Sequence, residues 1–273
     1  MQLGIFAKTF AGSNALPVLA AVRDSGFATT QFNLACVGLP SMPDAVPPEA
    51  IAAIRAASRE TGISLAALSG TYNMAHPDKS VRDRGLQQLR RVIETAAELE
   101  IPLVTLCTGT RNAEDQWAHH RENADPSTWR DMAAEMEKAL ELAEQNSVGL
   151  GIEPEQANIV TSASDAIRLI GELRSKRLHI VLDPANLFEQ VTPAEASDII
   201  ARAVDISAGH VAMAHAKDRH ADGRFATVGR GIVDFPGFIA GLRATGFDGP
   251  LVTHGLAAEE APGVARFLAD LIR

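Results

Sequence analysis

The sequence predicts an α/β protein, a (β/α)₈ TIM barrel in one domain that spans residues 1–273. Short apolar runs alternate with amphipathic segments along the whole chain. Four of the later runs end in a possible metal ligand, and these residues are Glu153, Asp183, His215 and His254. They are 30, 32 and 39 residues apart, which is about the length of one strand plus one helix.

Composition agrees with this fold class. A chain of 273 residues with 46% hydrophobic residues can bury a large core. The net charge of -9 opposes binding to nucleic acid, which requires clustered Lys and Arg. No apolar run approaches the roughly 20 residues of a membrane span, and the start MQLGIFAKTF lacks a signal-peptide pattern. We therefore expect a cytoplasmic protein with a small-molecule partner, no nucleic acid and no membrane.

The predicted strands are short runs rich in Val, Ile and Leu. The sequence contains eight of them, at Leu3–Phe6, Thr29–Cys36, Ser64–Ser69, Leu103–Cys107, Val148–Glu153, Leu178–Asp183, His210–His215 and Pro250–His254.

The segments between the strands have the period of helices. Arg82–Glu100 places its apolar residues on one face, and Thr128–Glu144 repeats the pattern. Ser164 is expected to cap a helix at Asp165, and Gly62, Gly246 and Gly249 mark helix ends near the next strand.

Cys36 and Cys107 lie in separate apolar runs, so we expect two buried thiols and no disulfide. The polar stretch Gly109–Pro126 follows the fourth strand and contains Arg111 and Trp117. We expect it to lie over the barrel mouth, where βα loops carry function.

The active site of a barrel lies at the carboxyl ends of its strands. The four strand-end residues should therefore meet there and form a metal site. Because side chains alternate along a strand, Glu155 can face the same way as Glu153, and Lys217 the same way as His215. Lys217 and the following Arg219, in HAKDR, suit sugar hydroxyls or a carboxylate. The alternative for any single residue is that a strand-end Glu or Asp caps the next helix.

Longer motifs carry a family resemblance over almost the whole chain. The runs are ALSGTYNMAHPD, EPE, IVLDPANLF, MAHAKDR and VGRGIVDFPGFIAGLRATGFDGPLV. Together they resemble the xylose isomerase-like TIM-barrel family of sugar phosphate isomerases and epimerases. The resemblance implies a divalent metal, with Mn²⁺ expected first and Zn²⁺, Co²⁺ or Mg²⁺ as alternatives. It also implies that Glu153, Asp183 and His215 are three of its four ligands.

The fourth ligand position departs from the family. Relatives have a glutamate after the last strand, whereas this chain has His254 in LVTHG. His254 can bind the metal through a neutral nitrogen, act as the second acid/base, or simply line the pocket. A mixed nitrogen and oxygen set suits zinc, manganese, cobalt or iron better than magnesium.

Other residues are expected to contact substrate. Asn186 stands where many sugar epimerases of the family have a histidine, and its amide can orient substrate but cannot titrate. His76, Arg111 and Trp117 follow the third and fourth strands and are the remaining candidates.

The resemblance implies a metal-dependent isomerase or epimerase of a sugar or keto sugar, phosphorylated or not. The reaction would pass through a metal-stabilised enediolate, with Glu153 or Glu155 removing a proton and His254 returning one. The alternatives are a metal-dependent sugar lyase or dehydratase, a non-catalytic sugar-binding barrel, and an apurinic-site endonuclease, which the acidic composition disfavours. Barrels of this kind also form homo-oligomers.

Overall fold

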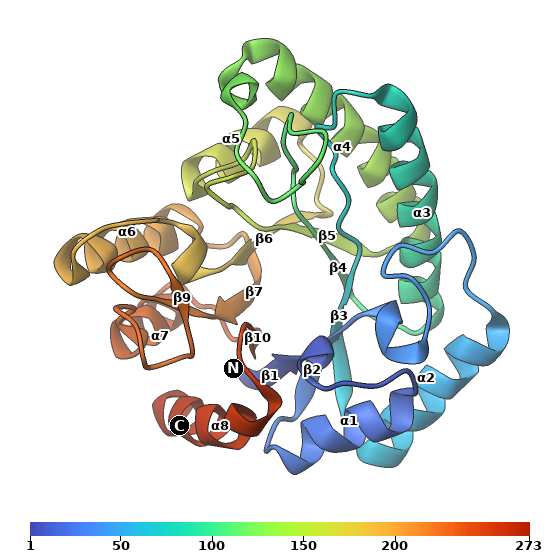
Figure 1. The fold of residues 1–273 in the computed structure, drawn as a ribbon, viewed down its shortest axis with the longest axis vertical. Coiled ribbons are helices and arrows are strands. Elements are labelled where there is room, and N and C mark those ends of the chain that lie inside the picture. The colour runs from blue at the N-terminus through green and yellow to red at the C-terminus, as the bar shows by residue number, and fades with distance from the viewer.

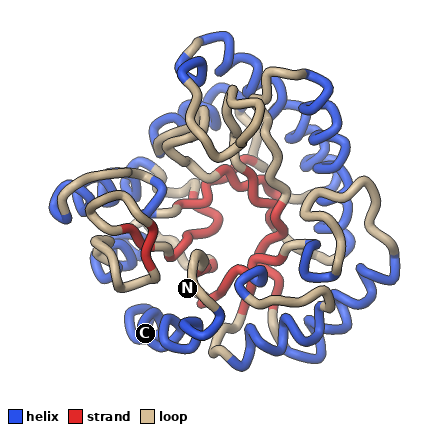
Figure 2. The backbone as a smooth tube through the Cα atoms, viewed as in Figure 1, coloured by secondary structure: helices blue, strands red, loops and turns tan.

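The computed structural model describes residues 1–273. Eight parallel strands close into a barrel, as the sequence predicted (Figure 1). The helices form a ring outside the strands (Figure 2). The barrel order is β1-β10-β7-β6-β5-β4-β3-β2, and β1 pairs with β10 to close it. The barrel strands are β1 (Gln2–Phe6), β2 (Thr29–Phe32), β3 (Ser64–Ser69), β4 (Leu103–Leu106), β5 (Gly149–Ile152), β6 (Leu178–Leu182), β7 (Val211–Ala216) and β10 (Pro250–Thr253).

A helix follows each barrel strand. The eight helices are α1 (Ala15–Asp24), α2 (Pro48–Thr61), α3 (Lys79–Glu98), α4 (Pro126–Asn146), α5 (Ala163–Leu173), α6 (Pro193–Ile206), α7 (Phe235–Ala244) and α8 (Ala261–Ile272). None of them combines the length and the hydropathy that crossing a bilayer requires. The predicted segments 82–100 and 128–144 correspond to α3 and α4, with ends that differ by two or three residues.

The barrel interior has an apolar layer beneath a polar one. Ala67, Leu103, Val181, Met213 and Val252 form a separate buried cluster inside the strands. The residue two positions further along each strand points the same way. Those residues are Ser69, Thr105, Asp183, His215 and His254. The alternation of each strand therefore places a polar side chain directly above the apolar plug, at the carboxyl end of the barrel.

Gly151 makes room within this plug. A Cβ atom at Gly151 would lie 2.8 Å from Val181 Cγ2 and 3.3 Å from the Leu103 methyl groups. A larger residue on β5 would therefore push the strand away from its neighbours, two residues before Glu153.

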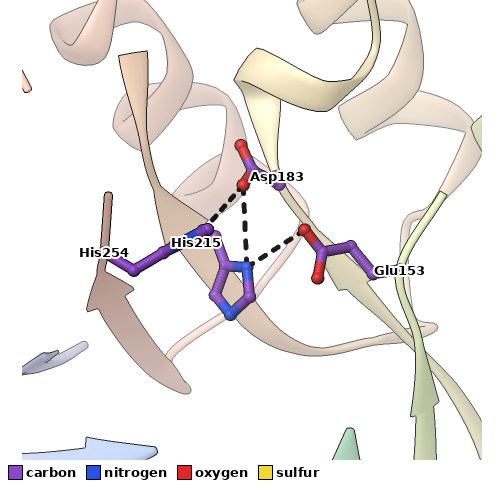
Figure 3. Close-up of side chains that lie close together, drawn as sticks. All are labelled: Glu153, Asp183, His215 and His254. Atoms are coloured by element: carbon purple, nitrogen blue, oxygen red, sulfur yellow. Dashed lines mark hydrogen bonds and ion pairs between the residues drawn. The ribbon is translucent and has the colours of Figure 1, made fainter. Parts of the chain in front are cut away.

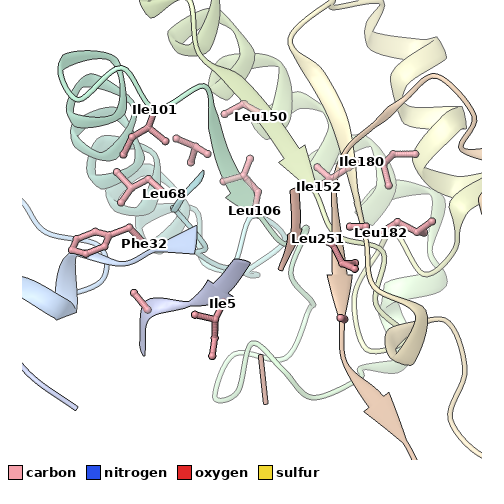
Figure 4. Packing of buried hydrophobic residues seen from close by; sticks show 14 of the residues in the cluster. Ile5, Phe32, Leu68, Ile101, Leu106, Leu150, Ile152, Ile180, Leu182 and Leu251 are labelled. Atoms are coloured by element: carbon pink, nitrogen blue, oxygen red, sulfur yellow. The ribbon is translucent and has the colours of Figure 1, made fainter. Parts of the chain in front are cut away.

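The main hydrophobic core lies between the strands and the helices. It contains 63 buried residues, among them the outward-facing Leu150, Ile152, Ile180 and Leu182 of β5 and β6 (Figure 4). Burying both strand faces explains why the strands appear in the sequence as apolar runs.

Several local predictions need correction. The second run was expected to be extended to Cys36, but β2 ends at Phe32 and Leu34–Val37 forms a 3-10 helix capped by the Asn33 side chain. The cap of α5 is Ser162 and not Ser164, because the Ser162 hydroxyl accepts the Asp165 N–H. Both cysteines are free and buried, as expected.

Two irregular segments cover the carboxyl end of the barrel. The first is the segment between β4 and α4, which includes a 3-10 helix at Arg121–Ala124. Gln116 and Trp117 of this segment line the cavity at the barrel mouth. A short antiparallel hairpin of β8 (Asp218–Arg219) and β9 (Phe225–Ala226) follows β7. The sequence did not predict this hairpin.

Candidate metal centre and substrate cavity

Glu153, Asp183, His215 and His254 converge at the carboxyl ends of β5, β6, β7 and β10 (Figure 3). One potential ligand atom from each residue lies within 4.8 Å of those of the other three. Asp183 Oδ2 is 2.9 Å from His254 Nε2 and 3.7 Å from His215 Nδ1. His215 Nδ1 is in turn 3.3 Å from Glu153 Oε1. The spacing expected from the sequence therefore produces a compact cluster of two carboxylates and two imidazoles.

The carboxylate of Asp183 is completely buried. Burial alone would raise the pKa of Asp183, but hydrogen bonds from His215 and His254 and the charge of Lys217 outweigh it. These partners hold the pKa of the Asp183 carboxyl well below its usual range. The cluster therefore keeps a negative charge on Asp183 in the barrel interior.

The two histidines respond in opposite ways. Burial works against the charged form of both, but the Glu153 charge and hydrogen bonds to Asp183 and Glu153 raise the pKa of His215 to about 9. Burial and the neighbouring His215 charge lower the pKa of His254 instead. At neutral pH, His254 is therefore the imidazole with a free nitrogen lone pair.

Gln31 fixes the orientation of the His215 ring. Its Nε2 group donates to the hydroxyls of Ser69 and Thr105 at 3.1 Å, so its carbonyl oxygen faces His215. His215 Nε2 donates to that oxygen at 2.9 Å. Nδ1 is thus the nitrogen that faces Glu153 and Asp183, as a metal ligand requires.

Asn186 links Glu153 to Lys217. Asn186 Nδ2 donates to Glu153 Oε1 at 2.7 Å, and Lys217 Nζ donates to Asn186 Oδ1 at 2.9 Å. Both the nitrogen and the oxygen of the Asn186 amide therefore form hydrogen bonds. Because the Lys217 ammonium can only donate, the amide group facing it must be the oxygen. Asn186 and His215 therefore both contact the same oxygen of the Glu153 carboxylate and hold it in place.

Glu155 also lines the cavity, which agrees with the strand alternation that allowed it to face the same way as Glu153. Burial and the nearby Glu153 charge raise the pKa of Glu155 to about 7, although Lys217 partly offsets them. Asn158 Nδ2 donates to Glu155 Oε2 at 3.2 Å, and the Cys107 thiol lies 3.9 Å from the same oxygen. Burial, and to a smaller extent the charges of Glu153 and Glu155, raise the pKa of Cys107 well above its usual range. This thiol therefore stays protonated.

A cavity of about 580 Å³ opens above the cluster. Only 5 of its 19 lining residues are hydrophobic, so its chemistry suits a ligand with many hydrogen-bonding groups. The polar lining residues beyond the cluster and Glu155 are Lys8, Gln31, Asn33, Ser41, Ser69, Thr71, Thr105, Gln116, Asn186 and Lys217.

Two partly exposed aromatic residues border this cavity. Trp117 is 49% exposed and Phe225 is 50% exposed. Lys217 Nζ lies 3.5 Å from the centre of the Phe225 ring, and the Arg219 guanidinium lies 4.2 Å from it. Phe225 therefore shields the buried ammonium of Lys217 through a cation–π contact.

Three of the expected substrate contacts lie outside the central cavity. Arg111 is tied to Asp131, to Thr128 Oγ1 and to the Ala75 carbonyl, so it braces the loop after β4. His76 faces the Ala113 carbonyl and lines a neighbouring groove. Arg219 stacks behind Phe225 and does not line the cavity.

Sequence reasoning missed Gln31 and Phe225. Gln31 is a polar residue in the apolar run TTQF, and that was the available signal. Phe225 lies in a polar loop, and only the hairpin brings it over Lys217.

The family model that matches this chain is described as a xylose isomerase-like TIM barrel and covers residues 19–271. No curated protein matches the sequence. Solved structures with a similar fold include a 3-keto-D-glucoside 4-epimerase from E. coli, with a TM-score of 0.79, 18% identity and 99% of each chain covered. A D-allulose 3-epimerase from Methylomonas sp. has a TM-score of 0.77 and 15% identity, with 99% of this chain and 98% of that chain covered. A D-psicose 3-epimerase from Clostridium cellulolyticum H10 has a TM-score of 0.75 and 14% identity, with 100% of each chain covered.

Proposed function

This chain belongs to the xylose isomerase-like TIM-barrel family, and on that premise we propose that it is a divalent-metal-dependent epimerase or isomerase of a keto sugar. The observation that carries the proposal is the convergence of Glu153, Asp183, His215 and His254 beneath a polar cavity. The epimerases of similar fold act on keto sugars according to their names, which supports the same substrate class here.

The four residues fit a divalent ion. They offer two carboxylate oxygens and two imidazole nitrogens within 4.8 Å of one another, and a buried carboxylate such as Asp183 needs a cationic partner. The mixed donor set favours Mn²⁺, Co²⁺ or Zn²⁺ over Mg²⁺. When bound, such an ion would polarise the oxygens of a hydroxy-ketone and make the proton beside the carbonyl easier to remove.

The chain supplies proton-transfer groups from two sides of the cavity. Glu155 follows β5, and its pKa of about 7 suits proton exchange at neutral pH. His254 follows β10, which β6 and β7 separate from β5 in the barrel. Because the pKa of His254 is lowered, its imidazole can accept a proton or bind metal as a neutral group.

Asn186 and Lys217 are proposed to orient the substrate. They hold each other and Glu153, and the remaining Lys217 donors can meet substrate oxygens. Lys217 is 9% exposed, so a hydrogen bond from its ammonium would be little screened by water.

The test is proton exchange at carbon. Protein loaded with Mn²⁺ or Co²⁺ is incubated in D₂O with a panel of ketoses, aldoses and keto sugars, and carbon-bound protons are followed by NMR. Deuterium next to a carbonyl, together with an accumulating epimer or isomer, is expected. An isomer without deuterium would indicate hydride transfer, and an eliminated product would favour a lyase. Sugar binding without any turnover would favour a non-catalytic barrel.

Two variants separate the roles of the carboxylates. Glu153→Gln should lose both Mn²⁺ binding and exchange. Glu155→Gln should bind Mn²⁺ normally and slow exchange by about 10²- to 10⁴-fold, the typical contribution of a general acid or base. Glu141→Gln, on the exposed face of α4, is the control. Wild-type exchange in Glu155→Gln would remove Glu155 from the mechanism.

A further inference from the structure

A groove of about 690 Å³ lies beside the central cavity, between α3 and the segment 112–117. Thr71, Gln116 and Trp117 line both hollows. Each hollow alone falls in the range of roughly 300–1,000 Å³ that encloses a whole small ligand. A single sugar ring over the metal cluster would therefore leave the groove unused, and a longer ligand could pass Trp117 into it.

Exposed apolar side chains gather around these two hollows. The protein exposes five large hydrophobic residues, Val81, Trp117, Ile206, Phe225 and Phe267. Val81 lines the groove, Phe225 lines the cavity, and Trp117 lines both. Aromatic faces of this kind, exposed beside polar groups, are suited to packing against a sugar ring.

Polar groups in the groove can complete such a contact. The Asn112 side-chain oxygen accepts from the backbone N–H groups of Glu114 and Asp115, which leaves its amide hydrogens for a ligand. Arg84 and Gln88 both donate to Asp44, at 3.2 and 2.9 Å.

The charge balance of the groove selects a neutral ligand. Arg84 is already paired with Asp44, and Glu114 and Asp115 add negative charge to the lining. A phosphate group would meet the Glu114 and Asp115 carboxylates there, and the one arginine of the lining, Arg84, already faces Asp44. Hydroxyl groups, in contrast, can both donate to and accept from these side chains.

We propose that the groove is a second sugar subsite, so that the substrate is a keto sugar carrying an uncharged second ring, a glycoside or disaccharide. This inference rests on the proposed function for the identity of the ring above the metal cluster. Trp117 lies between the two rings, and Val81, Asn112 and Gln116 contact the second one.

The test measures binding, not turnover. Mn²⁺-loaded protein is titrated by calorimetry with fructose and with three keto-disaccharides in which fructose carries a second ring: turanose, lactulose and isomaltulose. At least one disaccharide is expected to bind tenfold more tightly than fructose. Val81→Trp, which fills the groove, should lower that ratio to about one.

Ile206→Trp is the matched control. Val81 and Ile206 lie on the outer helices α3 and α6 and are 43% and 44% exposed, but only Val81 lines the groove. Ile206→Trp should keep the wild-type ratio. Disaccharides that bind no more tightly than fructose, or a ratio that survives Val81→Trp, would overturn the second subsite. Tight disaccharide binding without turnover of any sugar would overturn the proposed function and leave the subsite standing.

Discussion

The contact between Gln31 and His215 determines which imidazole nitrogen faces the other ligands. Gln31 lies on β2, which β1 and β10 separate from β7 in the barrel, and it is 7% exposed. Ser69 and Thr105 hold its amide so that the oxygen points at His215. Residues of this kind control metal affinity without binding the metal.

Gln31→Leu should therefore weaken Mn²⁺ binding by about 10- to 100-fold, because the His215 ring loses the acceptor that orients it. Competition with a fluorescent chelator measures the affinity. Gln31→Glu keeps an acceptor oxygen at this position and should restore most of the loss. Equal affinity in wild type and Gln31→Leu would exclude this positioning role.

The protonation of His215 should make metal binding depend on pH. Its pKa is raised to about 9, so below pH 9 the metal-free protein holds a proton that the ion must displace. Affinity should rise about tenfold per pH unit between pH 7 and pH 8.5, and level off above pH 9. Calorimetry in buffers of different ionisation enthalpy counts the released proton. A flat profile from pH 7 to pH 9 would contradict the raised pKa.

Among the structural elements, the hairpin of β8 and β9 depends on one buried carboxylate, that of Asp218. Asp218 is fully buried and accepts the backbone N–H groups of Arg219, Gly229, Gly231 and Val233 at 2.8 to 3.1 Å. It thereby ties the whole segment from β8 to the start of α7 to the barrel. The same segment carries Phe225 over Lys217.

Asp218→Ala should lower the free energy of unfolding by about 3 kcal/mol or more, because four buried or half-buried donors lose a charged acceptor. Asp218→Asn should rescue little, because its NH₂ group would face backbone N–H donors. Urea denaturation measures the change. Asp222→Ala, an exposed aspartate of the same hairpin, should behave as wild type. An Asp218→Ala protein as stable as wild type would show that the loop holds without this acceptor.

A bound metal ion would link several strands of the barrel and so affect the stability of the whole molecule. The four candidate ligands come from β5, β6, β7 and β10, which are four consecutive strands in the barrel order. An ion that binds only the folded state stabilises it by mass action.

At 100 times its dissociation constant, Mn²⁺ should add about 2.7 kcal/mol of stability, equivalent to a rise in Tm of roughly 5–10 °C for a chain of this size. Thermal unfolding followed by circular dichroism, with Mn²⁺ and then with excess EDTA, measures the shift. His254→Ala should reduce it. An unchanged Tm at saturating Mn²⁺ would argue against a metal site formed by these strands.

The sequence determined the barrel and the four residues of its candidate metal centre. Both results depend on local patterns: the apolar runs, the helical period, and side chains that follow a strand end. Parallel strands then bring Glu153, Asp183, His215 and His254 together. The same alternation allowed Glu155 to face the same way as Glu153, and the structure places it in the cavity lining.

Only the tertiary structure decided which polar side chains reach the cavity. Gln31 meets His215 across 184 residues of sequence, and Phe225 covers Lys217 because Asp218 folds the hairpin back. Arg111 follows β4 as expected, yet its guanidinium turns to Asp131 and the loop. These outcomes depend on side-chain directions and loop paths that distant contacts set, and such contacts leave no periodic pattern in the sequence.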